Sequence, residues 1–434
     1  MRWLFNIFYA GALCGAAPYW LWRMPRARRY RVGVSQRLGR MPRFGPGRRL
    51  WVHTVSVGEA AIPKGLVARF RERHPDWEVV LSTATDTGAQ RLREMYPDLP
   101  VLYWPFDFSP CVDRAMQRVR PTAVVLVELE VWPNFQLACW ERHIPVVIVN
   151  GRINPPSARL LRFIRGLQPA VWRAVHACCA RSTEDALRFV WAGLAPGKIV
   201  TTGSLKYDAL ALGADPESVD ALRRLFCMAE GDRVLVGGST HPGEEDVLCG
   251  VYGRLTADVP GLRLVLAPRH VERAKALERR LSQLGLKVLR KSCLDAGRCR
   301  VAGDEVILVD TIGDLPTCYA LASCCFVGRS MHPPGGGQNV MEAAALGKPV
   351  VVGPHTGNFR PEMQLLQSRN AVVVVHDEGE LEAQTRRLLV DRAEGMALGE
   401  RARQAIVEAR GATGRTLEHM ERVLEGAGLL GHGV

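Results

Sequence analysis

Short apolar runs of strand length alternate with longer amphipathic segments along most of this chain. In the first half, five such runs predict β-strands. They are Leu50–His53, Glu78–Thr83, Val101–Trp104, Ala123–Val127 and Val146–Val149. Helical patterns lie between them, for example at Ala60–Arg73 and Gly88–Met95. Because uninterrupted apolar strands are typical of parallel sheets covered on both faces, this half predicts an α/β domain.

The same alternation starts again after a polar region of small residues near Gly203–Pro216. The second half predicts six further strands, which are Arg233–Val236, Leu262–Ala267, Val306–Val309, Cys324–Val327, Val350–Val352 and Ala371–Val375. Arg410–Gly426 predicts a C-terminal helix. We therefore expect two doubly wound parallel-sheet domains facing a cleft.

The stretch Trp3–Trp22 contains twenty residues without a charge and is followed directly by four arginines between positions 23 and 29. Twenty apolar residues can just span a bilayer as a helix, and basic residues after them favour a cytoplasmic location for the following chain. The pattern predicts a membrane anchor that either spans the bilayer or lies along its surface. A buried helix is the alternative, because Asn6 and several Gly and Ala residues weaken the apolar run.

The positive charge of the chain is concentrated near its N-terminus. The net charge is +13, and residues 1–73 contain 15 Lys and Arg residues against two Glu residues, while the remainder is neutral. Such a block attracts anionic surfaces, including nucleic acid. Beside an apolar helix, an anionic lipid surface is the simpler partner, so we expect no nucleic-acid partner. The length of 434 residues and the 47% hydrophobic content indicate a globular protein with room for two cores.

Twelve cysteines are scattered along the chain without a CxxC pair. The doublets Cys178-Cys179 and Cys324-Cys325 lie in apolar, strand-like runs. Neighbours in a strand point to opposite faces, which makes them poor joint ligands. We predict reduced core residues in preference to zinc sites or disulfides.

Three consecutive glycines, Gly335, Gly336 and Gly337, stand between a predicted strand and a helical segment at Gln338–Leu346. A glycine turn at this position frees backbone N–H groups and suits a phosphate. Asn339 and Glu342 lie three residues apart and share a helix face, where a carboxylate can accept hydrogen bonds from ribose hydroxyls. The segment therefore predicts a nucleotide site.

Two further strand ends in the second half carry candidate phosphate ligands. Ser239 and Thr240 precede a helix start, where they could cap the helix or bind a phosphate oxygen. Arg269 ends another strand and can neutralise a phosphate, with a surface salt bridge as the alternative. Lys348 lacks a following Ser or Thr and ends a helix, so its Gly-Lys pair is a helix stop and not a P-loop.

Carboxylates follow two predicted strands in the first half. Glu59 falls in the first turn of a helix, where it is either a capping group or a base at the mouth of a cleft. Glu128 and Glu130 follow Ala123–Val127 and point to the same side if the strand continues through them. Two carboxylates at the end of a buried strand indicate functional-site residues and not core residues.

Taken together, these motifs resemble the 3-deoxy-D-manno-octulosonic acid (Kdo) transferases of Gram-negative lipopolysaccharide synthesis. The similarity runs in order through nearly the whole chain. The matching strings are SVGE at 56–59, ELEVWPN at 128–134, NGRI at 150–153, GSLKYD at 203–208, GSTHPGEE at 238–245, APRH at 267–270 and GGGQNVMEAAALGKPVVVGPHTGNF at 335–359. The chain departs from the family pattern at Arg329, Gln338, Val340 and Ala343.

The resemblance implies a GT-B glycosyltransferase with two Rossmann-like domains and a metal-independent, inverting transfer that needs no cofactor. It implies CMP-Kdo as donor, a lipid A precursor as acceptor, and association with the inner membrane, the catalytic domains facing the cytoplasm. The expected parts are an anchor helix at 1–23, an acceptor-binding domain at 30–208, a CMP-Kdo-binding domain at 215–405 and a C-terminal helix at 406–434.

The resemblance also implies roles for the motif residues. Glu59 is expected to be the general base, and Glu130, supported by Glu128, to orient the acceptor sugar or the Kdo group. Arg269 and the glycine amides are expected to stabilise the departing phosphate. The remaining expected contacts are Ser239, Thr240, Asn339 and Glu342 on the donor side, and Ser56, Gly58 and Lys206 on the acceptor side.

Two other functions fit parts of the pattern. A GT-B transferase that uses a UDP-sugar on another lipid-linked acceptor would share the fold, and nucleotide preference separates it from a CMP-Kdo enzyme. A non-catalytic sugar-nucleotide or lipid-binding protein would bind nucleotide without turnover. The presence of Glu59 disfavours that second alternative.

Overall fold

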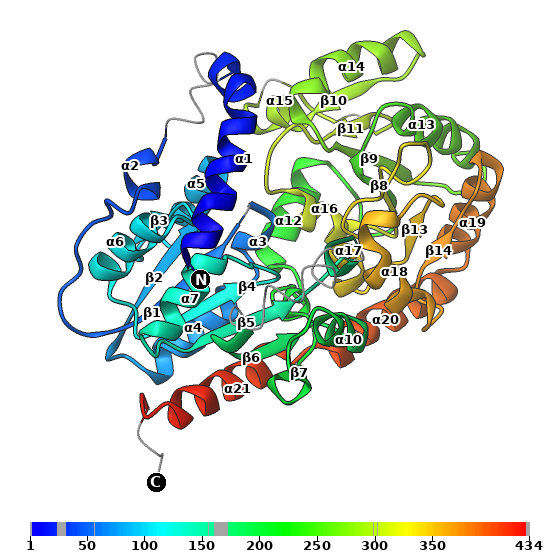
Figure 1. Ribbon diagram of the computed structural model, residues 1–434. Coiled ribbons are helices and arrows are strands. Elements are labelled where there is room, and N and C mark those ends of the chain that lie inside the picture. Colours follow the sequence, from blue (N-terminus) through cyan, green and yellow to red (C-terminus); the bar gives the residue numbers. More distant parts are fainter. Residues whose placement is uncertain are drawn as a thin grey trace. The chain divides into compact units, whose positions relative to one another are not determined.

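The computed structural model describes residues 2–23, 32–55, 57–154, 156–159, 172–297, 299–301 and 303–430. The chain forms two compact units, which are labelled by element in Figure 1. The first unit combines Met1–Ala209 with Ala409–Val434, and the second is Leu210–Glu408. The boundary after Ala209 falls within the polar region that the sequence predicts as a junction. The binding roles expected of the two domains stay a prediction.

The first unit is built on a parallel sheet in the order β3-β2-β1-β4-β5-β6-β7. Its strands are β1 (Arg48–Thr54), β2 (Trp77–Thr83), β3 (Val101–Tyr103), β4 (Ala123–Val127), β5 (Val146–Gly151), β6 (Val175–Ala180) and β7 (Ile199–Thr201). The five strands predicted in this half are all present, and β4 has the predicted bounds. The order reverses between β1 and β4, which pair directly.

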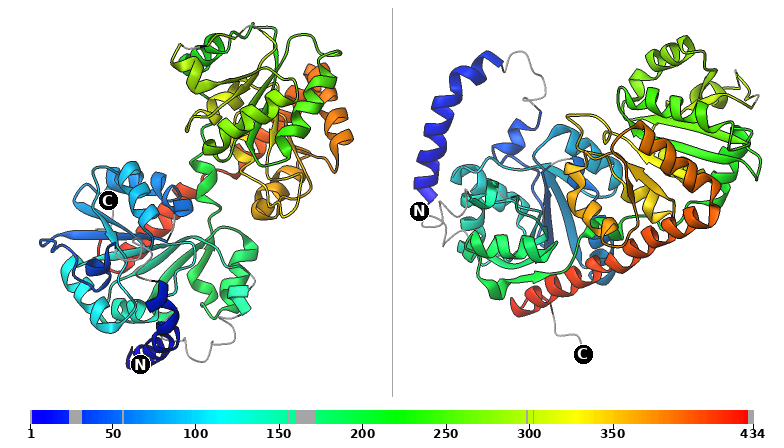
Figure 2. Two further views of the ribbon diagram at one scale, coloured as in Figure 1. Left: turned by 90° about the horizontal axis from the view of Figure 1, so that it is seen from above. Right: turned by 90° about the vertical axis from the view of Figure 1, so that its right-hand side faces the viewer.

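Helices cover both faces of this sheet (Figure 2). They are α1 (Arg2–Arg23), α2 (Val34–Arg37), α3 (Val57–Ala60), α4 (Lys64–Arg73), α5 (Asp86–Met95), α6 (Ser109–Val119), α7 (Pro133–Glu141), α10 (Thr183–Trp191), a 3₁₀ turn η4 (Pro196–Lys198), α11 (Leu205–Asp208) and α21 (Ala412–Gly426). The helix predicted at Ala60–Arg73 is in fact two helices. Pro63 stands just before α4, where its fixed φ suits a helix start.

Alternate residues of each strand enter different cores. Leu50 and Val52 of β1 belong to the cluster on one face of the sheet, whereas Trp51 belongs to the cluster on the other face. This is the arrangement that two-residue strand periodicity produces when both faces are covered. It explains why the strands have continuous apolar sequences.

The C-terminal helix α21 belongs to the first unit although it follows the whole second unit in sequence. Leu417, Met420 and Leu424 are fully buried in the same cluster as β1 and β4 residues. Glu421 accepts a hydrogen bond from Arg73 (2.9 Å) and lies 2.9 Å from His74 Nε2. In both views of Figure 2 the red helix lies against this sheet.

The second unit has its own parallel sheet in the order β10-β11-β9-β8-β12-β13-β14. Its strands are β8 (Arg233–Thr240), β9 (Leu262–Pro268), β10 (Val288–Arg290), β11 (Val306–Leu308), β12 (Cys324–Val327), β13 (Val350–Val352) and β14 (Val373–Val374). All six strands predicted here are present. The sequence pattern missed β10 because it contains only three residues, all half-buried.

The helices of the second unit also lie on both faces of its sheet (Figure 1). They are α12 (Pro216–Leu225), α13 (Glu244–Leu255), η5 (Val271–Arg273), α14 (Ala274–Gln283), α15 (Lys291–Asp295), α16 (Leu315–Leu321), α17 (Met341–Ala345), η6 (Gly357–Phe359), α18 (Arg360–Gln367), α19 (Glu378–Val390) and α20 (Arg392–Ala409). The predicted helix Gln338–Leu346 is shorter than expected, because the three preceding positive-φ glycines and the turn after them delay its start to Met341.

The N-terminal apolar stretch forms the helix α1, as predicted. Within the described residues, no helix combines the length and apolarity needed to cross a membrane.

The prediction for the cysteines is wrong at two positions. Cys293 and Cys299 form a disulfide, with Cα atoms 5.8 Å apart. Cys293 lies in the middle of α15 and Cys299 in the loop that follows, six residues apart, where spacing alone did not indicate a pair. The other ten cysteines are free, and eight of these are buried, as expected for small core side chains.

Candidate active site

In the first unit, candidate residues gather at the carboxyl ends of β1 and β4. The strand order reverses there, and open α/β sheets bind ligands outside such a point. Glu59 lies on α3, directly after β1, and Glu130 lies in the loop between β4 and α7. The two carboxylates interact electrostatically, because each ionised group raises the cost of charging the other.

Glu130 has a strongly raised pKa at this edge of the sheet. Burial, followed by repulsion from Glu59 and Glu128, raises its pKa to about 8, although the hydrogen bond from Trp132 opposes this shift. The indole Nε1 of Trp132 donates that bond to Oε2 at 2.7 Å. Only 12% of the Glu130 side chain is exposed. At neutral pH, Glu130 is therefore mainly a neutral carboxylic acid that can donate a hydrogen bond.

His53, which the sequence prediction did not select, lies directly against Glu130. Its Nε2 is 4.0 Å from Glu130 Oε2 and is buried without a hydrogen-bond partner in the described contacts. Its Nδ1 is 3.2 Å from the carbonyl oxygen of Ser82, and its ring stacks on Trp104 at 3.8 Å. Burial lowers the pKa of His53 to about 3, so the imidazole is neutral and the pair is not ionic.

Glu128 and Lys206 form a second pair at this edge. Lys206 Nζ lies 3.6 Å from Glu128 Oε1, and both residues belong to motifs that the sequence selected. Glu128 has φ 65° and ends the strand. Because the strand does not continue through Glu130, the prediction that Glu128 and Glu130 point to the same side does not hold. The two carboxylates have different neighbours.

Glu59 is held by the backbone just before its own helix. Its Oε2 accepts a hydrogen bond from the N–H of Val55 at 2.8 Å. The side chain is half-buried, and the neighbouring Gly58 is exposed. Ser56, predicted on the acceptor side, lies outside the described residues.

In the second unit, the predicted donor residues meet at the carboxyl edge of β8, β9 and β12. Asn339 Nδ2 donates to Glu342 Oε1 at 2.9 Å, so the two residues are in contact as expected, although Asn339 lies before the start of α17 and not on a face of the helix. Burial raises the pKa of Glu342, while Asn339 and the guanidinium of Arg269 oppose the shift. Arg269 is exposed and follows β9 directly. These three residues therefore lie within electrostatic reach of one another.

Two of the three glycine amides that are expected to stabilise the phosphate form hydrogen bonds within the protein. The N–H of Gly336 donates to His355 O (3.0 Å), and the N–H of Gly337 donates to Arg329 O (2.8 Å). Gly335, Gly336 and Gly337 all have positive φ. A Cβ at Gly336 would lie 2.4 Å from Asn358 Nδ2. The glycines thus allow two loops to pack closely, and two of their three amides are already used.

A buried carboxylate also fills the second predicted phosphate loop. Glu244 accepts four backbone hydrogen bonds, from His241 (2.9 Å), Arg329 (2.7 Å), Ser330 (2.8 Å) and Met331 (3.1 Å). Such a ring of amides is a typical anion site. Here the anion is a side chain of the protein, which joins the loops after β8 and β12.

Neither Ser239 nor Thr240 caps helix α13, so the first of their two predicted roles is wrong, and phosphate binding stays a prediction. Helix α13 has Gly243 at its N-cap position, without a side-chain cap. The hydroxyl of Thr240 donates to Glu245 Oε1 at 3.1 Å and is buried. Ser239 has φ 52°, and its carbonyl oxygen lies 3.2 Å from His241 Nδ1.

Histidine and arginine side chains, some of them missed by the sequence prediction, lie at this edge. His241 and His270 have ring centroids 5.8 Å apart. Burial lowers the pKa of His241, and the nearby Arg329 and His270 lower it further. A cluster with Arg269 can attract a phosphate. Among the described residues, no three His, Cys, Asp or Glu side chains gather into a group that could hold a metal ion.

Comparison with known proteins agrees with this arrangement. A family model described as 3-deoxy-D-manno-octulosonic-acid transferase (kdotransferase) matches residues 32–209. A solved structure of UDP-N-acetylglucosamine 2-epimerase resembles the chain with a TM-score of 0.59 and covers 91% of this chain and 99% of that one. At 15% identity, this likeness concerns the fold alone. It supports two α/β units of the GT-B kind.

Similar sequences extend over almost the entire chain. It is 32% identical over 431 residues to the 3-deoxy-D-manno-octulosonic acid transferase of Bordetella pertussis, which covers 95% of this chain and 98% of that protein. It is 29% identical over 402 residues to the enzyme of the same name from Haemophilus influenzae, with 92% of each chain covered. The chain therefore belongs to the 3-deoxy-D-manno-octulosonic acid transferase family.

Proposed function

We propose that this protein transfers Kdo from CMP-Kdo to a lipid A precursor, with inversion and without a metal ion. The observation that carries the proposal is the 32% identity to a Kdo transferase along nearly all of both chains. The carboxylates at the reversal point of the first sheet support it, because they supply the acid–base groups that glycosyl transfer needs.

The second unit is proposed to bind the donor. Transfer breaks the bond between Kdo and CMP, so negative charge grows on the departing phosphate. Arg269 would stabilise that charge, with Arg329 and His241 beside it. Glu342 and Asn339 would bind ribose hydroxyls and phosphate or sugar. The amides of Gly336 and Gly337 already donate to backbone carbonyls. In this proposal, cationic side chains therefore stabilise the phosphate more than the glycine loop does.

The first unit is proposed to activate the acceptor hydroxyl. Glu59 would remove its proton, because its carboxylate is fixed by the Val55 amide and faces a neighbour that stays protonated. A carboxyl group that burial keeps neutral can take a different role from a second carboxylate beside it. Glu130, as a neutral acid, would donate a hydrogen bond to a sugar oxygen, and Glu128 with Lys206 would hold the acceptor side.

Location at the inner membrane is the third part of the proposal, and α1 supports it. Its exposed residues are apolar and lie on one side, with exposed fractions of 61% for Trp3, 50% for Leu4, 61% for Ile7 and 70% for Phe8. A water-facing helix normally shows the reverse pattern. An apolar stripe of this kind suits the boundary between lipid head groups and acyl chains.

The opposite side of α1 is polar and binds the first unit. Arg2 donates to Glu141 (3.0 Å) and Asp113 (3.1 Å), and Tyr9 donates to Asp107 (2.8 Å). Asn6 hydrogen-bonds with Ser109. These bonds fix the orientation of α1, so its apolar side faces away from the protein and, in this proposal, toward the cytoplasmic leaflet.

The direct test is to incubate the membrane-bound protein with a lipid A precursor and freshly generated CMP-Kdo, and to weigh the product by mass spectrometry. A mass increase of one or more Kdo units is expected and also counts the additions. A parallel reaction with UDP-sugars separates the alternative donor class. Product only from a UDP-sugar, beside an active control enzyme, would overturn the proposal.

Two variants test the assigned roles. Glu59→Gln is expected to lower turnover by about 10²- to 10⁴-fold, the usual contribution of a general base, while CMP affinity stays near normal. The control Glu72→Gln removes an exposed carboxylate of α4 and should leave turnover unchanged. Arg269→Ala should weaken the donor site. Normal turnover of Glu59→Gln would contradict the assignment.

A further inference from the structure

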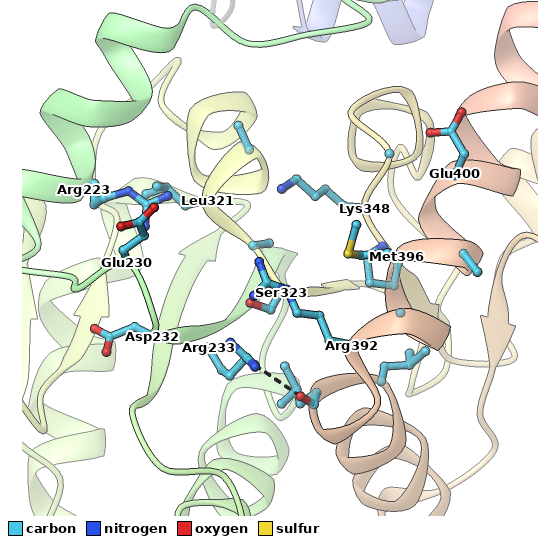
Figure 3. A pocket seen from close by; sticks show the side chains of 18 residues that line it. Arg223, Glu230, Asp232, Arg233, Leu321, Ser323, Lys348, Arg392, Met396 and Glu400 are labelled. Carbon is cyan, nitrogen blue, oxygen red and sulfur yellow. Dashed lines mark hydrogen bonds between the residues drawn. The ribbon is translucent and has the colours of Figure 1, made fainter.

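A cavity of about 620 Å³ opens at the edge of the second sheet opposite to the donor residues. It lies at the amino ends of β8, β12 and β13, where Arg233 and Ser323 stand at or just before the strand starts. Its walls come from the end of α12, the turn between α17 and β13, and the start of α20 (Figure 3). No residue assigned to the proposed transfer reaction lines it.

Cations without counter-ions face this cavity. Arg223, Lys348 and Arg392 line it, and none of their side chains forms an ion pair or hydrogen bond in the described part of the chain. Figure 3 shows the Lys348 ammonium group and the Arg223 guanidinium group extending into the space from opposite walls. The cavity therefore contains an excess of uncompensated positive charge.

The acidic side chains in the lining offset only part of this charge. Asp232 pairs with Arg263 (3.8 Å), and Glu400 pairs with Arg403 (3.3 Å); both arginines lie outside the lining. Glu230 is exposed and has no ion-pair partner within 4 Å among the described residues.

Lys348 is the group whose position most requires a ligand. It is half-buried, and burial together with the nearby Arg223 lowers its pKa. Cations can complement the carboxyl ends of helices, and α17 ends just before Lys348. A capping lysine would donate to the free carbonyls there, but its ammonium group makes no such bond among the described contacts. An anion would supply the missing partner.

The walls of the cavity are closely packed, so the charges cannot simply move apart. Helix α20 rests on the turn that carries Lys348 through Gly399, while Gly395 of the same helix packs on the carbonyl of Leu388 in α19. A Cβ at Gly399 would lie 2.0 Å from the carbonyl oxygen of Gly347, which itself has φ 68°. Only glycine allows this approach. The turn is therefore held in place, and Lys348 with it.

We propose that this cavity binds a phosphate-bearing anion, with Lys348, Arg223 and Arg392 as its ligands. Arginine and lysine together suit phosphate oxygens, and the volume lies within the range of small-molecule sites. Ser323 at the floor can add a hydroxyl contact. The proposal is independent of the transfer reaction, since the site is on the other edge of the sheet from Arg269, Asn339 and Glu342.

Calorimetric titration of the full-length protein in detergent with inorganic pyrophosphate tests this site. We expect saturable binding that weakens at least tenfold in Lys348→Met and in Arg223→Gln. The control Lys275→Met removes an exposed lysine of α14 and should bind like the wild type.

A second arm identifies the source of the phosphate. Dihexanoyl phosphatidylglycerol, a short-chain phospholipid, replaces pyrophosphate in the same titrations. Lys348-dependent binding of either probe supports the site and assigns it to a free anion or to a lipid head group. If Lys348→Met does not fold, Arg392→Gln at the exposed start of α20 takes its place. Binding of neither probe, or binding that these variants leave unchanged, overturns the proposal.

Discussion

Burial gives Glu130 a protonation state that its sequence neighbours do not indicate. The carboxyl group is an ordinary acid in an unfolded chain, where its pKa is 4.5, but in the fold its pKa is about 8. The folded state therefore holds this proton more tightly than the unfolded state. Stability must fall as the pH rises from about 4.5 through about 8, where the folded protein finally loses the proton.

Glu130→Gln should remove this part of the pH dependence, because glutamine does not titrate. Between about pH 6 and about pH 9, the variant should gain about 2 to 3 kcal/mol of unfolding free energy relative to the wild type. All ten tryptophans lie in the first unit, so tryptophan fluorescence during urea unfolding monitors that unit alone. His53 is neutral throughout this range. Parallel curves for the two proteins would contradict the raised pKa.

Glu244 illustrates a residue whose role is structural although its motif resembles a binding loop. Removing it leaves four backbone amides without acceptors, two of them buried and two partly buried, and each buried group of this kind costs about 1–3 kcal/mol. Glu244→Ala should therefore unfold the second unit at a clearly lower temperature, measured by circular dichroism. Glu272→Ala, at a side chain 75% exposed, is the matched control. Equal melting of both variants would show that the amides find other partners.

At the scale of the element, α1 has a stable orientation but a surface unsuited to water. Its polar residues bond the first unit, and its apolar residues are exposed. Helix formation follows from the local sequence. Which side faces outward depends on the partners that α6 and α7 provide, such as Ser109 and Glu141.

Ile7→Ser combined with Phe8→Ser should reduce binding to vesicles that contain anionic phospholipid by about tenfold or more, since each buried apolar side chain contributes about 1.5–3 kcal/mol. Co-sedimentation with the vesicles measures the effect. Ile312→Ser, at a residue 89% exposed in the second unit, removes a similar side chain without touching α1. Unchanged sedimentation of the double variant would rule out this face as the membrane contact.

At the scale of the whole molecule, the first unit is discontinuous in sequence. The chain leaves it after Ala209 and returns at Ala409, and α21 then completes one face of its core. Folding of this unit must therefore await synthesis of the C-terminus. This dependence is a property of the topology and cannot be inferred from any one element.

Leu417→Ala should lower the unfolding free energy of the first unit by about 2–5 kcal/mol, as expected for a large buried side chain. Truncation after Ala409 should have a larger effect. The tryptophan fluorescence midpoint in urea measures both. The substitution Val407→Ala, at an exposed residue of α20, serves as the control. A truncated chain with a normal midpoint would show that the first unit folds without α21.

Local sequence alone determined most of the elements and their class. Apolar runs such as Ala123–Val127 and Cys324–Val327 became strands with the predicted bounds, because a strand buried on both faces requires an uninterrupted apolar sequence. The pairing of Asn339 with Glu342 was also expected, although Asn339 contacts Glu342 from the loop before α17 and not from the helix itself. The family motifs located the carboxylates and Arg269.

Only the tertiary structure decided how these groups are used, because burial and long-range contacts have no signature in local sequence. Some contacts join residues far apart in the sequence and so could not be predicted from local patterns. They are the contact of His53 with Glu130, the four amides that bind Glu244, and the packing of α21 on the first core. The acceptors of the glycine amides could not be predicted for the same reason. The sequence determined which groups are present, and the packing determined which remain free to bind a ligand.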